Sequence, residues 1–317
     1  MAWTGTGNEI ARAINAGICW FKNYEEEINS LNVFPVPDGD TGKNIKNTLQ
    51  AVKKTLATTD KSSAGQVFTA ASKGSLMGAK GCSGIIISLM FQGFAEKLQN
   101  KKKIGLDDFA AAMEGASQKA WDGISNPVKG TILSVADAAA KSAKASLENN
   151  VDSEEMFKRV LQDSHKALLK TKHQLPALKK ANVVDAGGLG LVYFLEGVSR
   201  YIMAMPVTGI KAKRKVIKNI SGAPFPSAAR YCLEFILTGK SITAGALKDK
   251  LIKKGNSLII NKAAAGIYKV HLHTNEPHKV LENTRKSGII TKIKIDDMKK
   301  QHRDFLKMNY EKNSDSN

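Results

Sequence analysis

The spacing of apolar residues changes once along this chain, and the change limits what the chain can fold into. From residue 9 to residue 203, apolar side chains recur every three or four residues, the period of a helix that buries one face. Beyond Met205 the pattern changes to alternation, most cleanly over Ile267–His273, which is typical of a β-strand. A chain of 317 residues is long enough for two cores. We therefore expect a multi-domain protein, with a helical domain followed by a small α+β domain.

The helical domain is expected to cover residues 1–205. Almost nothing in this region alternates with period two, and short loops marked by Gly or Pro separate the periodic segments. We predict about eight helices, over residues 9–30, 43–57, 65–76, 84–99, 106–120, 131–148, 153–170 and 188–203.

The rest of the chain divides into a linker, a sheet domain and a tail. Residues 206–225 are basic and then rich in turn formers, which is typical of a linker. Residues 226–300 contain, in order, a strand, a helix, two strands, a helix and a strand, the pattern of a split βαβ sheet. Residues 301–317 are expected to form a C-terminal tail with a polar, frayed end. The strands are predicted over Tyr231–Leu237, Ser257–Ile260, Ile267–His273 and Ile289–Ile295, and the helices over Ala244–Lys254 and Pro277–Ser287.

Charge and cysteine content narrow the function classes. The net charge of +19 favours anionic partners, either phosphate-bearing substrates or nucleic acid. The lysines are spread along the whole chain without an RNA-binding aromatic motif or zinc-finger spacing, which argues against a nucleic-acid site. Three cysteines indicate a reducing compartment and no disulfide framework. No signal peptide or membrane span is evident, so a cytoplasmic protein is expected.

One loop combines a stiff backbone with two carboxylates. In NVFPVPDGDTG (residues 32–42), two prolines limit the backbone, and the spacing of Asp38 and Asp40 lets both carboxylates face one point. Mg²⁺ prefers oxygen ligands in fixed positions and keeps waters and phosphates for the rest of its shell. An isolated Asp-Gly-Asp can equally be a turn that caps a helix. The Pro-x-Pro before it and the Thr-Gly after it favour a magnesium-nucleotide site.

Three further segments place glycines or small polar residues at predicted helix starts. They are MGAKGCSG (77–84), PVKGTILS (127–134) and VVDAGGLG (183–190). Free backbone N–H groups at such positions can bind phosphate. The first segment lacks the spacing of a Walker A loop and can equally reflect close helix packing, and Thr131 and Asp185 can be simple helix caps. If the four starts share one end of a bundle, their helix dipoles converge on one anion.

These segments resemble, in order and spacing, the nucleotide-binding (L) domain of dihydroxyacetone kinases, in the version found in the bacterial fatty acid kinase A subunit. The matching stretches are LNVFPVPDGDTGKN, LMGAKGCSGIIIS, NPVKGTILSVADAA and VVDAGGLGLVYFLEG, within residues 9–203. The resemblance implies a barrel of eight antiparallel helices that holds ATP with two Mg²⁺ at one end.

The resemblance also implies roles for individual residues. Asp38 and Asp40 would bind the metal ions and, with Thr41, form the catalytic group. The chain departs from the family pattern at Lys80 and Cys82, which stand where the family has arginine and asparagine, and also at Lys43 and Lys129. The asparagine-to-cysteine change removes an amide donor and acceptor. The nucleotide and its phosphates would be contacted by Asn32, Gly42, Asn44, Gly81, Ser83, Gly84, Thr131, Asp185, Gly187 and Gly188.

The α+β domain carries a second group of polar residues. His271 and His273 lie at i and i+2 on a predicted strand, so both side chains point to one face, and Cys232 lies on the first strand of the same predicted sheet. A Cys/His/His set with an open fourth position suits catalytic zinc, whereas two surface histidines and a buried cysteine are the simpler interpretation. Resemblance to the middle domain of fatty acid kinase A implies that these three residues bind Zn²⁺, with Glu234 orienting a ligand.

The implied reaction is transfer of the ATP γ-phosphoryl group to the carboxylate of a fatty acid, which gives an acyl phosphate. No apolar ligand channel can be read from the sequence, so a fatty-acid-binding partner protein is expected to present the substrate. The family has a third, C-terminal domain without a counterpart before Asn317, which a separate polypeptide is expected to supply unless the protein is shortened. The family also tends to form homodimers.

Other interpretations remain open. One is a dihydroxyacetone (glycerone) kinase-type subunit. Another is a non-catalytic nucleotide-binding regulator, which Lys80 and Cys82 support. A third is a metal-dependent hydrolase or metal-stabilised adaptor centred on Cys232, His271 and His273.

Overall fold

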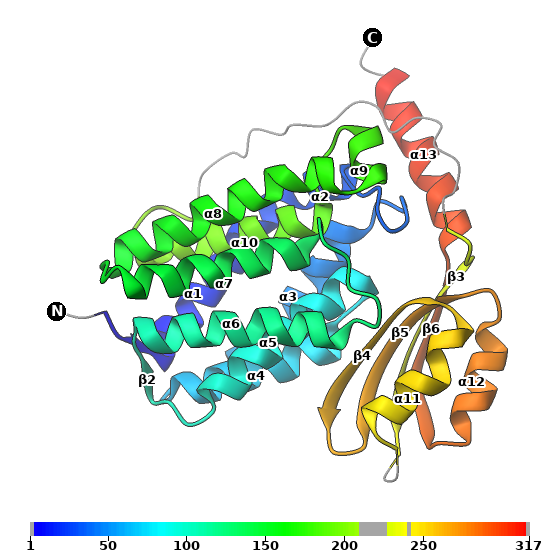
Figure 1. Ribbon diagram of the computed structural model, residues 1–317, viewed down its shortest axis with the longest axis horizontal. Coiled ribbons are helices and arrows are strands. Elements are labelled where there is room, and N and C mark those ends of the chain that lie inside the picture. Colours follow the sequence, from blue (N-terminus) through cyan, green and yellow to red (C-terminus); the bar gives the residue numbers. More distant parts are fainter. Residues whose placement is uncertain (1–2, 209–226, 240–241, 315–317) are drawn as a thin grey trace. The chain divides into compact units, whose positions relative to one another are not determined.

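The computed structural model describes residues 3–208, 227–239 and 242–314, with side chains as far as Lys307. The chain divides into two compact units, called here the helical unit and the sheet unit (Figure 1). The helical unit is drawn from Met1–Leu31, Asp40–Trp121 and Val128–Ile217. The sheet unit is drawn from Asn32–Gly39, Asp122–Pro127 and Lys218–Asn317. The linker expected over 206–225 falls mostly on residues outside the described chain.

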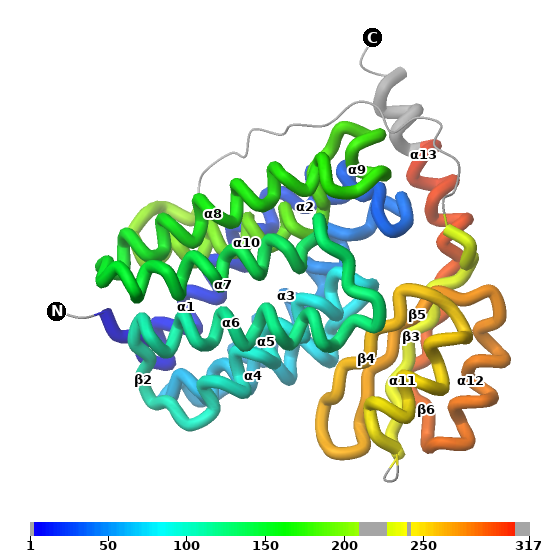
Figure 2. The backbone as a smooth tube through the Cα atoms, in the orientation of Figure 1, coloured from blue at the N-terminus to red at the C-terminus, as the bar shows by residue number. Residues whose placement is uncertain are grey.

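The helical unit consists of helices that lie alongside one another (Figures 1 and 2). A short two-stranded ribbon joins Gly5–Thr6 (β1) to Lys103–Ile104 (β2). The helices are α1 (Gly7–Phe21), α2 (Glu25–Ser30), α3 (Thr41–Ala57), α4 (Ala64–Gly78), α5 (Gly81–Leu98), α6 (Leu106–Gly123), α7 (Ile132–Glu148), α8 (Ser153–Gln174), α9 (Pro176–Ala181) and α10 (Ala186–Ile202).

All eight predicted helical segments are helical, with two differences from the prediction. The segment 9–30 is divided by a 3-10 turn at Lys22–Tyr24, after which three glutamates form the first turn of α2, where negative charge is favourable. The six-residue helix α9 was not predicted, because a segment of this length is too short to show a periodic pattern. None of the helices in the described residues is both long and apolar enough to cross a membrane.

Side-chain caps fix where several of these helices begin. In each case an oxygen of the residue before the helix accepts a backbone N–H of the first turn, which satisfies a group that the helix itself leaves unpaired. At α1 the cap is reciprocal, because the Glu9 carboxylate also accepts the N–H of Thr6. The capping residues are Thr6 for α1, Ser63 for α4, Thr131 for α7, Asp152 for α8 and Asp185 for α10.

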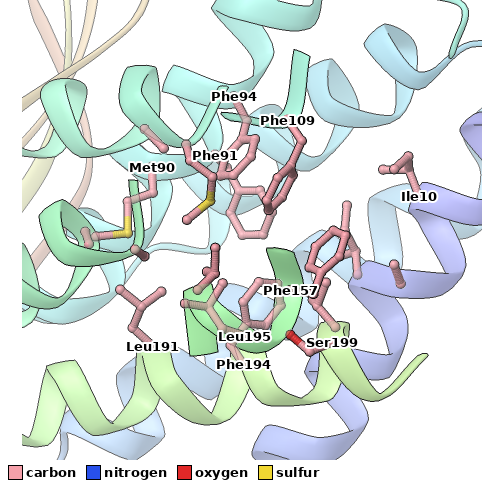
Figure 3. Close-up of a pocket in the computed structure, with 18 of the residues that line it drawn as sticks. Ile10, Met90, Phe91, Phe94, Phe109, Phe157, Leu191, Phe194, Leu195 and Ser199 are labelled. Carbon is pink, nitrogen blue, oxygen red and sulfur yellow. The ribbon is translucent and has the colours of Figure 1, made fainter. Parts of the chain in front are cut away.

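An apolar cavity of about 100 Å³ lies inside the helical unit. Most of the long helices contribute to its lining, and the rings of Phe91, Phe109 and Phe157 point into the same region (Figure 3). On α5 and α10 the lining begins at Ile87 and Leu191, in the second turn of each helix, so the cavity lies behind these helix starts. The sequence had shown no apolar channel, because side chains from distant segments form this space.

The sheet unit contains four antiparallel strands in the order β4-β5-β3-β6. This is the predicted split βαβ arrangement, and a core of buried Leu, Val, Phe and Tyr side chains joins one face of the sheet to helices α11 and α12. The C-terminal helix α13 (Met298–Ser314) follows β6 directly, so the expected tail begins inside a helix. The other elements are β3 (Tyr231–Thr238), α11 (Ala244–Leu251), a 3-10 turn (Ile252–Lys254), β4 (Asn256–Ala264), β5 (Ile267–Thr274), α12 (Pro277–Arg285) and β6 (Ile289–Asp297).

Two short pieces from the first half of the chain also belong to the sheet unit. At the edge strand β4, Ile124 forms a bridge with Ile259, and the Ser125 N–H donates to the carbonyl of Leu258 at 3.0 Å. Residues 32–39 pack against β3 and α13, with Val36, Cys232 and Met298 buried in one cluster. The sequence did not indicate these additions, since neither piece has the alternation of a strand.

Truncation of Phe157 tests the aromatic packing around the cavity. The Phe157 side chain is 2% exposed, and its ring centroid lies 4.7 Å from that of Phe109. We expect Phe157→Ala to lower the free energy of unfolding by about 3–5 kcal/mol, because it removes apolar contacts and enlarges the cavity. Chemical denaturation measures the loss. Leu169→Ala, on the same helix but 63% exposed, is the control and should change stability by less than about 0.5 kcal/mol.

Candidate functional site

The four helix starts singled out in the sequence lie at one end of the helical unit. Gly81, at the start of α5, packs against the side chain of Asn44 in the first turn of α3. A Cβ placed on Gly190 of α10 would lie 2.7 Å from Ile45 of α3, so α10 and α3 also approach closely near their starts. Gly187 of α10 lies against the first residue of α7. The positive ends of the α3, α5, α7 and α10 dipoles are therefore grouped.

Asp40 precedes α3 and presents its carboxylate at this end of the unit. It makes no side-chain cap hydrogen bond to the first turn of the helix, so the capping interpretation does not describe it. Instead, the Asn44 amide donates to Asp40 Oδ1 at 2.6 Å, and the Asn44 N–H donates to the Asp40 carbonyl at 2.8 Å. Asn44 is 6% exposed, so a buried amide orients a half-buried carboxylate.

The preceding loop is folded back on itself. The side-chain amide of Asn32, which is 2% exposed, donates to the Val36 carbonyl at 2.7 Å, and the Asp38 N–H donates to the same carbonyl at 3.0 Å. Gly39 has φ +69, a left-handed conformation that glycine adopts without strain. Asn32 thus has a role in shaping the loop, and Asp38 lies half-buried at its tip.

Thr131 and Asp185 act as helix caps in the structure. Thr131 accepts the Leu133 N–H at 3.4 Å, and Asp185 accepts the Gly188 N–H at 2.7 Å. Burial raises the pKa of the Asp185 carboxyl to about 6, against the opposing effect of its backbone hydrogen bonds. Both capping interpretations left open by the sequence are therefore realised, and Asp185 is an acid that titrates close to neutral pH.

Several motif glycines have a packing reason. A Cβ on Gly42 would clash with the backbone of α2 and approach the Asn29 side chain to 2.9 Å. At Gly84 it would clash with the side chain of Thr48, and at Gly188 it would lie 2.9 Å from Val135. Close helix approach thus accounts for these glycines, whether or not they also contact phosphate.

The remaining predicted residues line the starts of α3 and α5. Thr41 is buried as the first residue of α3, and Cys82 and Ser83 are half-buried in the first turn of α5. Three lysines are exposed beside helix starts, namely Lys43, Lys80 and Lys129. Their charges add to the positive ends of the dipoles and favour an anionic ligand.

Cys232, His271 and His273 come together on one face of the sheet. Cys232 pairs directly with His273 across the β3–β5 ladder, and their ligand atoms and that of His271 all lie within 4.8 Å of one another. Two ligand atoms on a tetrahedral zinc ion lie roughly 3.3–3.8 Å apart, so the set can close around such an ion with small shifts.

The environment of the two histidines fits a metal ligand set. His271 is completely buried, and within the described chain its Nε2 has no hydrogen-bond partner. Its Nδ1 lies 3.3 Å from Glu234 Oε1, the arrangement in which a carboxylate orients a ligating imidazole. Burial, followed by the charge of His271, lowers the pKa of His273 to about 3, which keeps this imidazole neutral and able to coordinate.

Metal analysis tests this set. We expect the purified protein to bind about one equivalent of a metal that prefers sulfur and nitrogen ligands, and His273→Ala to lose it. Glu234→Gln keeps the shape but weakens ligand orientation, so metal affinity should fall roughly 10–100-fold. His278→Ala, which removes an exposed histidine of the same unit, is the control. Equal metal content in His273→Ala and His278→Ala would contradict the assignment.

Because the pKa of Asp185 is raised, the contribution of this residue to the free energy of unfolding should depend on pH. The folded carboxyl holds its proton to about pH 6, whereas the unfolded one releases it near pH 4, so the folded state binds the extra proton between these values. Stability from this group therefore falls as pH rises from about 4 to 6, by on the order of 3 kcal/mol. Asp185→Asn retains a cap oxygen without an ionisable group, so its stability relative to wild type should rise over this window.

Urea denaturation at several pH values measures this difference. Asp152→Asn, at the exposed cap of α8, provides the matched control, and its difference from wild type should vary by less than about 0.5 kcal/mol. A pH-independent difference for Asp185→Asn would show that the buried carboxyl does not titrate in this range.

Comparison with known proteins identifies the family to which the chain belongs. The DAK2 domain family matches residues 35–200, and the middle domain of the family of proteins like the fatty acid kinase A subunit matches residues 228–305. Protein YloV of Bacillus subtilis is 33% identical over 315 residues, which cover 95% of this chain and 57% of that protein. An uncharacterized protein of Staphylococcus saprophyticus is 29% identical over 96% of this chain and 57% of its own length.

The chain thus spans a little over half of the length of these curated relatives. Among solved structures, the dihydroxyacetone kinase of C. freundii matches with a TM-score of 0.46 and 16% identity, over 60% of this chain and 34% of that one. The DAK2 match covers more than half of the chain and includes all four helix starts. The chain therefore belongs to the DAK2 domain family and carries, after that domain, a middle domain like that of the fatty acid kinase A subunit.

Proposed function

We propose that this chain is an ATP-dependent kinase subunit that phosphorylates a fatty acid. The observation that carries the proposal is the grouping of four helix starts at one end of the helical unit, with the Asp40 carboxylate held there by Asn44. Positive helix ends and exposed lysines suit the triphosphate, and carboxylates suit Mg²⁺. The family assignment supports kinase chemistry, and similarity of the middle domain to that of the fatty acid kinase A subunit supports the acceptor.

Some residues of the proposed site would hold the metal ions, and others would bind the phosphates. Asp38 and Asp40 would hold two Mg²⁺ ions beside Thr41, and the ions would neutralise phosphate charge when bound. Backbone N–H groups at the starts of α3, α5, α7 and α10 would bind the phosphate oxygens. One carboxylate oxygen of the fatty acid attacks the γ-phosphorus as the bond to the β,γ-bridging oxygen breaks, and the products are an acyl phosphate and ADP. The ionised carboxylate carries no proton to remove, so this reaction needs no general base.

We propose that the sheet unit holds Zn²⁺ at Cys232, His271 and His273. A thiolate and two imidazoles are a donor set that zinc prefers over Mg²⁺. A fatty-acid-binding partner protein would present the acyl carboxylate, and the whole assembly would be a cytoplasmic homodimer.

A non-catalytic nucleotide-binding regulator is the second candidate. Cys82 favours it, since the thiol at the start of α5 lacks the amide that the family pattern has at this position. A glycerone kinase-type subunit would share the nucleotide site and differ in its acceptor. These candidates are separated by supplying ATP with either glycerone or a fatty acid on its binding protein, and by measuring ADP, acyl phosphate and glycerone phosphate.

Substitution of the loop carboxylates tests the central proposal. We expect Asp38→Ala and Asp40→Ala to weaken Mg²⁺-dependent ATP binding at least tenfold and to abolish phosphoryl transfer, because each removes a metal ligand. The matched control is Asp60→Ala, which removes an exposed aspartate of the helical unit and should leave both properties unchanged. Calorimetry gives the affinity, and acyl phosphate trapped with hydroxylamine gives the rate. Unchanged turnover in both variants would disprove the proposal; tight Mg-ATP binding without transfer in the wild type would favour the regulator.

A further inference from the structure

Three residues of α13 form a stripe that contacts the carboxylate loop, and both lie within the sheet unit. Met298, His302 and Phe305 are spaced i, i+4 and i+7, so they share one face of the helix. All three are buried, at 1%, 3% and 7% exposure, although Arg303 and Asp304 beside them are exposed. The sheet alone does not account for the burial of this stripe, because the stripe also contacts loop residues 36–39.

Each residue of the stripe meets a successive part of the loop. Met298 packs with Val36 and Cys232 in a buried cluster. His302 Nδ1 lies 2.6 Å from the Pro37 carbonyl oxygen. The Phe305 ring lies against Gly39, where any Cβ would clash with it. The contacts therefore run along the loop in the same order as the residues run along the helix.

The His302 contact has a defined direction. The Pro37 carbonyl can only accept, so Nδ1 must be the protonated nitrogen of the His302 ring. Both partners are buried, and a buried carbonyl that loses its donor is costly. On the other side of Asp38, the left-handed φ of +69 at Gly39 is covered by the Phe305 ring, which limits alternative backbone paths there. The backbone is thus held at both residues that flank Asp38.

We propose that the α13 stripe positions Asp38 for magnesium-nucleotide binding, with His302 and Phe305 as positioning residues. Mg²⁺ requires near-octahedral geometry at about 2.0–2.1 Å, so its carboxylate ligands must be held closely. A site of this kind depends on supporting contacts that keep ligands within roughly 0.5 Å of the productive geometry. The inference rests on the proposed function, because it assigns the stripe a role only if the loop binds the metal.

The test separates metal-dependent from metal-independent nucleotide binding. ADP affinity is measured by calorimetry on the full chain, once with Mg²⁺ and once with EDTA. We expect His302→Ala to reduce the affinity gained from Mg²⁺ about tenfold, because the Pro37 carbonyl loses its donor and the loop moves. Affinity in EDTA should stay within about twofold, since the helix starts that bind phosphate belong to the other unit.

Two further variants distinguish positioning from general stability. His302→Asn places an amide N–H near the position of Nδ1 and should restore most of the gain from Mg²⁺. Phe305→Leu keeps an apolar contact but withdraws the ring from Gly39, and should reduce the gain about threefold while the protein stays folded. Arg303→Ala, on the exposed face of the same helix, is the control and should match wild type. Thermal unfolding of each variant reports on the fold.

The outcomes separate the two proposals. If wild type gains no ADP affinity from Mg²⁺, or if Asp40→Ala gains as much as wild type, the proposed function fails. If those two proteins behave as expected but His302→Ala and Phe305→Leu match Arg303→Ala, only the positioning role of α13 is overturned. An equal loss with Mg²⁺ and with EDTA would also overturn it, because it would indicate a general structural effect.

Discussion

The conformation of the loop from Asn32 to Asp40 is the constraint on which the proposed nucleotide site depends. Residues 32–39 belong to the sheet unit. Asp40, the residue before α3, belongs to the helical unit. The loop is held from within by the Asn32 amide, from α13 by His302, and at its end by Asn44, which fixes the Asp40 carboxylate. Each is a hydrogen bond to a buried or half-buried group, so the cost of an unsatisfied partner opposes other loop conformations. Two carboxylates on a chain of ordinary flexibility would lack this preorganisation.

The sequence predicted the elements well and their neighbours poorly. Helical spacing, caps and turn residues are local, and they located the long helices of the helical unit and the four strands of the sheet within a few residues. The i, i+2 spacing of His271 and His273 also predicted correctly that both face one side of the sheet. In contrast, the pairing of Ile124 and Ser125 with β4 and the contact of α13 with the loop depend on tertiary packing between distant segments. Periodicity shows which face of α13 is buried, but it does not identify the partner.

Motif glycines illustrate why a site cannot be assigned from composition alone. At Gly42 and Gly84 the absence of a side chain lets helices approach, and this requirement would exist without any ligand. Thr131 and Asp185 similarly have complete roles as caps. The grouping of the helix starts therefore favours phosphate binding, whereas no single residue does so by itself. Local packing and ligand binding are compatible here, because the backbone N–H groups of a tightly packed helix start still point along the helix axis.

The two candidate metal sites offer different kinds of ligand, although a residue of one site packs beside the loop that carries the other. The loop offers hard carboxylate oxygens, whereas the sheet offers a thiol and two imidazoles, so the two sets prefer different ions. Yet Cys232 packs in the same buried cluster as Val36, two residues before Asp38. An ion bound at Cys232 would restrain its side chain and so limit the movement of Val36. Within the sheet unit, Cys232 and the C-terminal helix thus both contact the loop that carries Asp38.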